Sequence, residues 1–95
     1  MVQQNRLVEQ FMALVQIDSE TKNEAEIGGV LKQEFTALGL DVFVDDAAQK
    51  TGHGYGNIIA TLPASAGTNA APMLFTSHMD TVTPGKGIKP HIDDN

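Results

Sequence analysis

In the stretch Met73-Leu74-Phe75-Thr76-Ser77-His78-Met79-Asp80-Thr81-Val82-Thr83-Pro84-Gly85, an apolar run leads directly into a histidine and an aspartate two residues apart. The run over residues 73–77 predicts a buried strand, and open α/β sheets hold their ligand sites just beyond the carboxyl ends of such strands. Side chains two residues apart point to the same side of an extended backbone, so we expect His78 and Asp80 to lie together. The turn residues at 84–87 keep both side chains in a loop.

This pair of side chains suits a metal site. A carboxylate that accepts the N–H of one imidazole nitrogen fixes the tautomer and leaves the lone pair of the other nitrogen free for a metal ion. We therefore interpret His78 as a candidate metal ligand, and we assign Asp80 to the catalytic site as the residue that orients it. The alternative is a surface histidine beside an aspartate, because a His-x-Asp pair occurs by chance in many chains.

Composition limits the class of protein and its partners. Ninety-five residues allow one small domain, and 41% hydrophobic residues indicate a globular chain. A net charge of −6 argues against nucleic acids and anionic membranes as partners. No cysteine is present, so a metal ion would be held by His, Asp, Glu or water. We expect a soluble cytoplasmic protein, because the chain has neither an apolar signal segment over residues 1–6 nor a run long enough to span a bilayer.

Two amphipathic helices are expected before residue 40. Over residues 5–17, apolar side chains recur at helical spacing. A second helix over residues 23–39 is indicated by a capping box of Asn23 and Glu26 at its start, and by Gly39 as the residue that follows its end.

Glycines mark two further features. The pair Gly28-Gly29 inside the second helix costs about 1 kcal/mol per glycine relative to alanine, so we interpret it as a point of close packing on a neighbour. Three glycines in residues 52–56 indicate a turn that joins two strands. A phosphate-binding loop is the alternative, but its glycines would lead from a strand into a helix, whereas a strand pattern follows here.

Three stretches carry strand patterns: residues 40–46, 57–62 and 73–77. The first alternates, with one face better buried, and is typical of an edge strand. The second is a continuous apolar run, typical of a strand covered on both faces. Residues 63–72 indicate an exposed loop, and residues 88–95 resemble the start of a fourth strand that runs into a turn. The predicted fold is α/β, in the order helix, helix, strand, strand, strand.

The other histidines and the paired aspartates are interpreted as structural. His53 lies between glycines, where an exposed turn position is expected. His91 is expected to be an exposed or half-buried structural residue. The aspartate pairs at 45–46 and 93–94 lack the spacing of a calcium-binding loop, and we interpret them as solvated strand ends.

The stretch Ser77-His78-Met79-Asp80-Thr81-Val82-Thr83-Pro84-Gly85 resembles the first metal-binding signature of the M20 family of zinc peptidases. Nearly the whole chain resembles the N-terminal part of the peptidase T (tripeptide aminopeptidase) branch of that family. Three other segments also match the family's layout: Val15-Gln16-Ile17-Asp18-Ser19-Glu20-Thr21, Gly39-Leu40-Asp41-Val42 and Gly56-Asn57-Ile58-Ile59-Ala60. The resemblance implies that His78 is a ligand of one zinc ion in a two-zinc site, and that Asp80 is the aspartate that orients it.

By this resemblance, residues 1–95 are the N-terminal portion of a three-layer α/β/α zinc-exopeptidase catalytic domain. The rest of that domain, its other metal ligands and general base, and an inserted smaller domain would lie beyond residue 95. The implied activity is hydrolysis of the N-terminal residue of short peptides, chiefly tripeptides, by metal-activated water in the cytoplasm. A homodimer of the parent protein is one option. With one ligand, the chain alone is expected to be inactive.

Two alternatives stay open. Relatives with this signature also deacylate amino acids or act as carboxypeptidases. The second alternative belongs to another class: a non-catalytic fragment or interaction module that folds or associates without metal.

Overall fold

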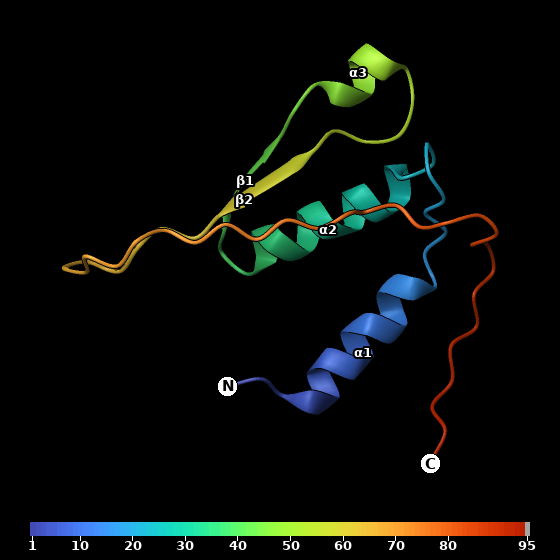
Figure 1. Cartoon of the computed structure of the whole chain (residues 1–95), viewed down its shortest axis with the longest axis horizontal. Coiled ribbons are helices and arrows are strands. Elements are labelled where there is room, and N and C mark those ends of the chain that lie inside the picture. The colour runs from blue at the N-terminus through green and yellow to red at the C-terminus, as the bar shows by residue number, and fades with distance from the viewer. Residues whose placement is uncertain (95) are drawn as a thin grey trace.

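The structure, a computed structural model, describes residues 1–94, which form three helices and two strands (Figure 1). Their order along the chain is α1 (Gln4–Val15), α2 (Ala25–Ala37), β1 (Asp41–Val44), α3 (Ala47–Thr51) and β2 (Ile58–Thr61). The predicted α/β class is confirmed at this level. The predicted order is wrong in two places, because α3 was not predicted and the expected strand over residues 73–77 does not form.

Both predicted helices are present, but α2 begins differently from the prediction. Its N-cap is Glu24, and no side chain caps it, so the capping box of Asn23 and Glu26 is wrong. A tight turn fixes the start of the helix: the Asn23 N–H donates to Glu20 O at 2.8 Å, and the Lys22 N–H donates to Glu24 Oε1 at 2.8 Å. A turn held by one backbone bond and one bond to a side chain therefore precedes the helix in place of the predicted cap.

Gly39 ends α2 as predicted. It has a φ of 86°, the left-handed conformation that glycine adopts without steric cost. The Gly39 N–H donates to Thr36 O at 3.0 Å, and the Leu40 N–H donates to Phe35 O at 3.1 Å. These two bonds form a Schellman motif, which satisfies carbonyl groups at the end of the helix and turns the chain into β1.

Strands β1 and β2 form an antiparallel pair, in register from Asp41 opposite Thr61 to Val44 opposite Ile58. Helix α2 packs on one face of this pair, and the side chains of that face are half-buried: Val42, Val44, Ile58 and Ala60. On the other face Phe43 is 62% exposed and Ile59 is 48% exposed. The prediction that one face of β1 is better buried than the other is therefore confirmed. The prediction that β2 is covered on both faces is wrong, because among the described residues only one face has a helix against it.

The close packing predicted for the glycine pair is confirmed for one of its two members. A Cβ atom at Gly28 would overlap the aromatic ring of Tyr55, so α2 and the glycine-rich loop before β2 approach each other at this point. A Cβ atom at Gly29 would meet nothing within 4 Å. The glycine-rich loop leads into a strand, as predicted.

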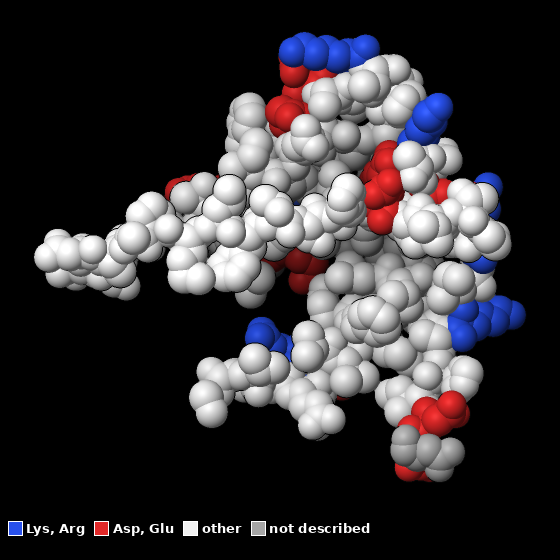
Figure 2. Space-filling model, viewed as in Figure 1, with Lys and Arg blue, Asp and Glu red and all other residues white. Residues whose placement is uncertain are grey.

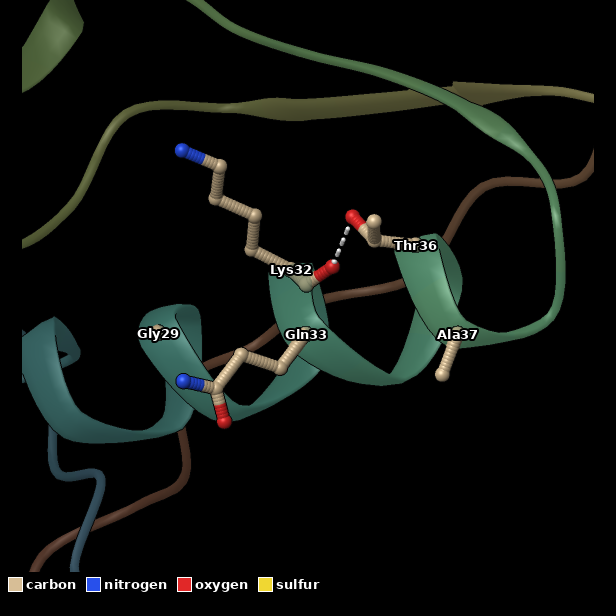
Figure 3. A pocket seen from close by; sticks show the side chains of 5 residues that line it. All are labelled: Gly29, Lys32, Gln33, Thr36 and Ala37. Atoms are coloured by element: carbon tan, nitrogen blue, oxygen red, sulfur yellow. Dashed lines mark hydrogen bonds between the residues drawn. The ribbon is translucent and has the colours of Figure 1, made fainter.

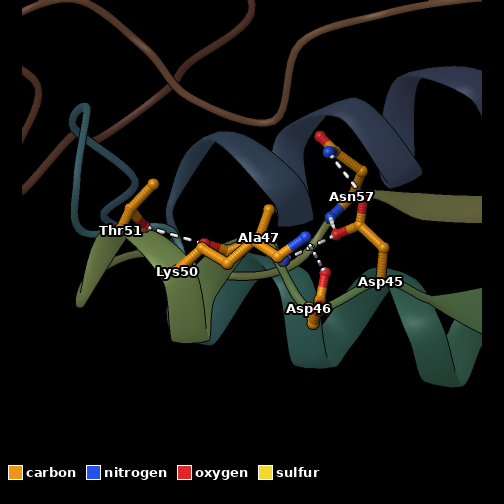
Figure 4. A network of polar contacts seen from close by, with 6 residues as sticks. All are labelled: Asp45, Asp46, Ala47, Lys50, Thr51 and Asn57. Atoms are coloured by element: carbon orange, nitrogen blue, oxygen red, sulfur yellow. Dashed lines mark hydrogen bonds and ion pairs between the residues drawn. The ribbon is translucent and has the colours of Figure 1, made fainter.

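The unpredicted helix α3 comes between the two strands along the chain, and Asp45 binds backbone groups before and after it (Figure 4). Asp45 Oδ1 accepts the Asn57 N–H at 2.7 Å and the Ala47 N–H at 3.1 Å, and Asp45 Oδ2 accepts the Asn57 side-chain amide at 2.8 Å. These bonds tie the end of β1 to the start of β2 and hold the pKa of the Asp45 carboxyl below its usual value, with the Asn57 side chain as the main cause. Interpreting Asp45 as a solvated strand end was therefore wrong. Its neighbour Asp46 is largely exposed and pairs with Lys50 at 3.4 Å.

Residues 62–77 form an arm that extends away from the sheet, turns, and returns past α2 (Figure 1). Residues 63–72 are exposed, as predicted, and the Thr68 N–H donates to Ser65 O at 3.3 Å in the turn. On the face shown in Figure 2 the arm carries no charged side chain. The arm is also rich in exposed apolar residues: Leu62, Met73, Leu74 and Phe75.

The strand predicted over residues 73–77 is wrong for this structure. Phe75 is 84% exposed, and no described residue pairs with this segment in a ladder. A strand needs a neighbour to satisfy its N–H and C=O groups, and the two strands of the structure pair with each other. Residues 88–94 also form no strand, and the last residue of that predicted element, Asn95, lies outside the described residues.

The described part of the chain is open for its size. Its radius of gyration is 15.8 Å, against about 13 Å for a compact domain of 100 residues. Ile27, at 5% exposed, is the one hydrophobic side chain in residues 1–94 that is buried, and no residue of α1 is buried. No helix within the same residues is long and apolar enough to cross a membrane.

Candidate functional site

His78 and Asp80 lie together, as their spacing predicts. His78 Nδ1 is 3.4 Å from Asp80 Oδ1. The two side chains differ in exposure, at 92% for His78 and 29% for Asp80, so the carboxylate is held against the protein while the ring projects into solvent. The Nε2 atom of His78 makes no hydrogen bond or ion pair with any described residue. The pair can therefore offer one imidazole nitrogen to an external electrophile or metal ion.

Thr21, far from the dyad in sequence, holds the aspartate in place. Its hydroxyl group donates a hydrogen bond to Asp80 Oδ2 at 2.7 Å. This bond is the main reason that the pKa of the Asp80 carboxyl lies below its usual value; partial burial opposes the shift, and the nearby His78 imidazole adds to it. Asp80 is therefore an anchored carboxylate, with one oxygen toward Thr21 and the other toward the ring.

The segment that carries Thr21 is joined to the loop after the dyad by backbone pairing. The Thr81 N–H donates to Ser19 O at 2.9 Å, and Glu20 and Thr81 form an isolated parallel β-bridge. Ser19 is 8% exposed, so this junction is among the better protected parts of the chain. The end of the first helical region is thus fixed beside the dyad.

Two acidic side chains of the same segment bind the backbone farther along the loop. The Gly85 N–H donates to Glu20 Oε2 at 2.9 Å, and the Gly87 N–H donates to Asp18 Oδ1 at 2.9 Å. Lys86 Nζ lies 3.9 Å from Glu20 Oε1. We call residues 18–21 the anchor segment, because they hold the dyad and the loop over residues 80–87 through side chains and backbone together.

The chain contains a second His-x-Asp pair, which serves as an internal comparison. His91 Nε2 lies 3.5 Å from Asp93 Oδ1, but both side chains are exposed, at 78% and 76%. No other described residue hydrogen-bonds to Asp93. Local spacing alone therefore brings a histidine and an aspartate together, and the anchored carboxylate is what distinguishes the pair at residues 78 and 80.

The described residues do not complete a metal site. Within residues 1–94, no group of three or more His, Cys, Asp or Glu side chains is arranged to hold a metal ion. His53, expected in an exposed turn, is exposed. His78 is thus a single candidate ligand, without companions in this part of the chain.

A large open cavity adjoins the dyad. It measures about 1290 Å³ and lies between α1, α2, β2 and residues 75–81, with His78 and Asp80 in its lining. Much of the remaining lining is apolar: Phe11, Leu14, Val15, Leu31, Phe35 and Ile58.

A second, shallow depression lies on the outer face of α2 (Figure 3). It is formed by successive turns of α2, from Gly29 to Ala37. Within it, the Thr36 hydroxyl group donates a hydrogen bond to Lys32 O at 2.8 Å. It shares no residue with the dyad, and no His, Cys, Asp or Glu side chain lines it. We assign it no role.

The sequence predicts the dyad but not the contacts of the anchor segment. The polar residues Asp18, Glu20 and Thr21 follow the first helix directly, but about 60 residues separate them from the loop that they bind. A local pattern cannot show such a contact. The available signal was the run of hydrogen-bonding side chains where the helix pattern stops.

No protein-family model matches the chain. The chain is 55% identical over 94 residues to YqjE, an uncharacterised protein of Bacillus subtilis, with 99% of this chain and 25% of YqjE aligned. It is 33% identical over 102 residues to a peptidase T of Bacillus cereus, with 94% of this chain and 23% of that protein aligned.

Two solved structures are similar to the chain over almost its full length. The crystal structure of aminopeptidase PepT from Bacillus cereus gives a TM-score of 0.91 at 59% identity, covering 98% of this chain and 25% of that one. A tripeptidase from Staphylococcus aureus gives 0.87 at 46% identity, covering 99% of this chain and 25% of that one. The chain spans about a quarter of the length of the relatives that it matches.

Proposed function

We propose that this chain, which is homologous to the N-terminal quarter of peptidase T, forms the N-terminal section of a metal-dependent aminopeptidase that acts on tripeptides. The observation that carries the proposal is the anchored pair of His78 and Asp80. In a metallopeptidase of this kind, the chain contributes one metal ligand and the carboxylate that orients it.

The donor set of the pair fits this role. A zinc-ligating histidine usually has one ring nitrogen on the metal and donates the other N–H to a carboxylate. Asp80 Oδ1 stands beside Nδ1 of His78, and the ring is exposed on its Nε2 side. His78 would therefore hold zinc through Nε2, and Asp80 would fix the tautomer that makes this possible.

The chemistry is divided between the ion and the polypeptide. When bound, zinc supplies a Lewis acid and lowers the pKa of water that attacks the peptide carbonyl. In this chain Asp80 lies beside Nδ1 of His78, Thr21 holds Asp80, and the anchor segment fixes the loop on which both dyad residues lie. These residues orient the site and do not themselves transfer the proton to the leaving amine.

A catalytic zinc ion needs about three protein ligands, so the remaining ligands and the general base must come from other polypeptide. We assign them to the part that corresponds to the other three quarters of the relatives. The cavity supports this assignment, because about 1290 Å³ exceeds the usual 300–1,000 Å³ of a small-molecule pocket. Its apolar lining and the unpaired residues 73–77 suit the packing of further strands of a larger α/β domain.

A hybrid enzyme tests the proposal. This chain replaces the corresponding quarter of Bacillus cereus PepT, a substitution favoured by 59% identity and a TM-score of 0.91. The hybrid, supplied with zinc, should hydrolyse a tripeptide with a free amino terminus. His78→Ala should lower kcat/KM at least 100-fold, in line with the loss of a metal ligand, whereas His53→Ala should leave it unchanged.

Two results would count against the proposal. Full activity of the His78→Ala hybrid would remove the role of the dyad. A preference for an N-acylated amino acid over the tripeptide would instead favour the deacylase alternative and would leave the metal role intact.

A further inference from the structure

The two His-x-Asp pairs of this chain differ in two features that their common spacing does not explain. Asp80 is 29% exposed and accepts a hydrogen bond from the Thr21 hydroxyl, whereas Asp93 is 76% exposed and has no such bond from the described residues. The contacting ring atom also differs, Nδ1 in His78 and Nε2 in His91. Only the anchored pair leaves Nε2, the outer nitrogen, open.

We propose that Thr21 is a positioning residue: its hydroxyl group holds the Asp80 carboxylate so that His78 keeps its proton on Nδ1 and presents Nε2. As a role in catalysis, this inference rests on the proposed function. As a statement about the side chains of residues 21, 78 and 80, it stands without any metal ion.

The hydroxyl group can do this because its own position is fixed. Thr21 follows Ser19 and Glu20, which pair with the backbone at Thr81, one residue after Asp80. The donor and the acceptor are therefore attached to two chain segments that are joined beside them. A bond of 2.7 Å to Oδ2 fixes the rotation of the carboxyl group, and Oδ1 then faces the ring.

The consequence is a bias in the tautomer of His78. A neutral imidazole carries its proton on either nitrogen, and the partner of one nitrogen decides which form is favoured. With Asp80 fixed beside Nδ1, the Nδ1–H form should dominate. With Asp80 free to rotate, His78 should exchange between both forms, as an exposed histidine without a fixed partner does.

The experiment measures the ¹⁵N shifts of the three imidazole rings by long-range ¹H–¹⁵N NMR in the full 95-residue chain. The sample is kept near pH 8, above the ordinary histidine pKa of about 6.5. The matched variants are Thr21→Val, which removes the hydroxyl group at nearly constant shape, and Thr21→Ser, which retains it. His53, exposed in the glycine-rich loop, is the internal reference.

In the native chain and in Thr21→Ser, the ¹⁵N shifts of His78 should report mainly the Nδ1–H form. In Thr21→Val they should move most of the way to those of His53, while the Tyr55 ring signals stay unchanged. Native-like His78 shifts in Thr21→Val would overturn the proposal, as would equal changes in the valine and serine variants. If Thr21→Val also shifts the Tyr55 signals, Thr21→Ala is measured in its place, with the same change expected at His78.

A second readout connects the inference to the metal. In the hybrid enzyme, Thr21→Val should weaken zinc affinity about 10-fold, measured by competition with a chromophoric chelator, and Thr21→Ser should restore it. Unchanged zinc affinity would contradict the catalytic part of the inference. Failure of the proposed function would look different, because His78→Ala would then change neither zinc binding nor activity.

Discussion

Glu20 should control how firmly the loop after the dyad is held. Its Oε2 atom accepts the N–H of Gly85, and its side chain is only 12% exposed. Gly85 is itself buried. The substitution Glu20→Ala leaves this N–H without its acceptor, whereas Glu20→Gln keeps an oxygen at the same position.

The magnitude follows from the kind of bond that is lost. A hydrogen bond to a charged group contributes about 1.5–3 kcal/mol. The ion pair of Glu20 with Lys86 adds little, because its atoms are 3.9 Å apart and the lysine side chain is 70% exposed. Since 1.36 kcal/mol corresponds to a factor of ten, the Gly85 amide should exchange roughly 10- to 150-fold faster in Glu20→Ala.

Amide hydrogen exchange followed by NMR measures this change at single residues. Asp18→Ala is the matched control: Asp18 accepts the N–H of Gly87, which is exposed, so its loss should open the loop less. Glu20→Gln should accelerate exchange less, by roughly 5- to 13-fold, because a neutral hydrogen bond still contributes about 0.5–1.5 kcal/mol, which is about 1–1.5 kcal/mol less than the charged one. Unchanged exchange at Gly85 in Glu20→Ala would show that this bond does not hold the loop, and equal acceleration by Asp18→Ala would show that Glu20 has no special role.

Three further predictions follow from other parts of the structure. Gly28→Ala should lower the free energy of unfolding, measured by urea denaturation, by about 1–3 kcal/mol relative to Gly29→Ala, because only the methyl group at position 28 overlaps Tyr55. Equal free energies of unfolding in the two variants would contradict the packing seen at α2. Because the pKa of Asp45 is lowered, its carboxylate stabilises the fold at pH values above its ordinary pKa, and this contribution is lost as the pH falls through the lowered pKa. Asp45→Asn should therefore make stability, measured by circular dichroism, less dependent on pH in the acid range. An unaltered pH dependence would contradict this prediction. Calorimetric titration of the 95-residue chain with zinc should detect no submicromolar site, because one imidazole is one ligand; a tight site with defined stoichiometry would contradict the count of ligands.

Helices α1 and α2 and the two strands could be predicted because their signals are local. Apolar spacing marks α1 and α2, Gly39 ends α2 through a left-handed residue, and alternation marks β1. The pair at residues 78 and 80 is local as well, since two residues of separation suffice to bring the side chains together.

The errors have a different origin, since each depends on what lies beside a segment. Residues 73–77 have the composition of a strand, but a strand forms only where another chain segment accepts its hydrogen bonds. The face of β2 that carries Ile59 was expected to be covered, but coverage depends on a neighbouring element that a local pattern does not show. Helix α3 is short and begins at the Asp45 network, whose partner Asn57 lies 12 residues away.

The anchor segment shows the same limit at the functional site. Thr21 and Glu20 gain their roles from contacts to Asp80 and Gly85, 59 and 65 residues farther along the chain. Their types are ordinary for a helix end, where hydrogen-bonding side chains commonly gather. Only the folded chain shows which of them reaches the dyad.

Zinc content is the most direct test of the idea that His78 is a metal ligand in a peptidase T-type enzyme. The hybrid with Bacillus cereus PepT is dialysed against zinc-free buffer, and the metal bound per protein is measured by atomic absorption for the unmodified, His78→Ala and His53→Ala proteins. We expect His78→Ala to retain less zinc than the unmodified hybrid and His53→Ala to retain the same amount. Equal zinc in all three folded proteins would contradict it.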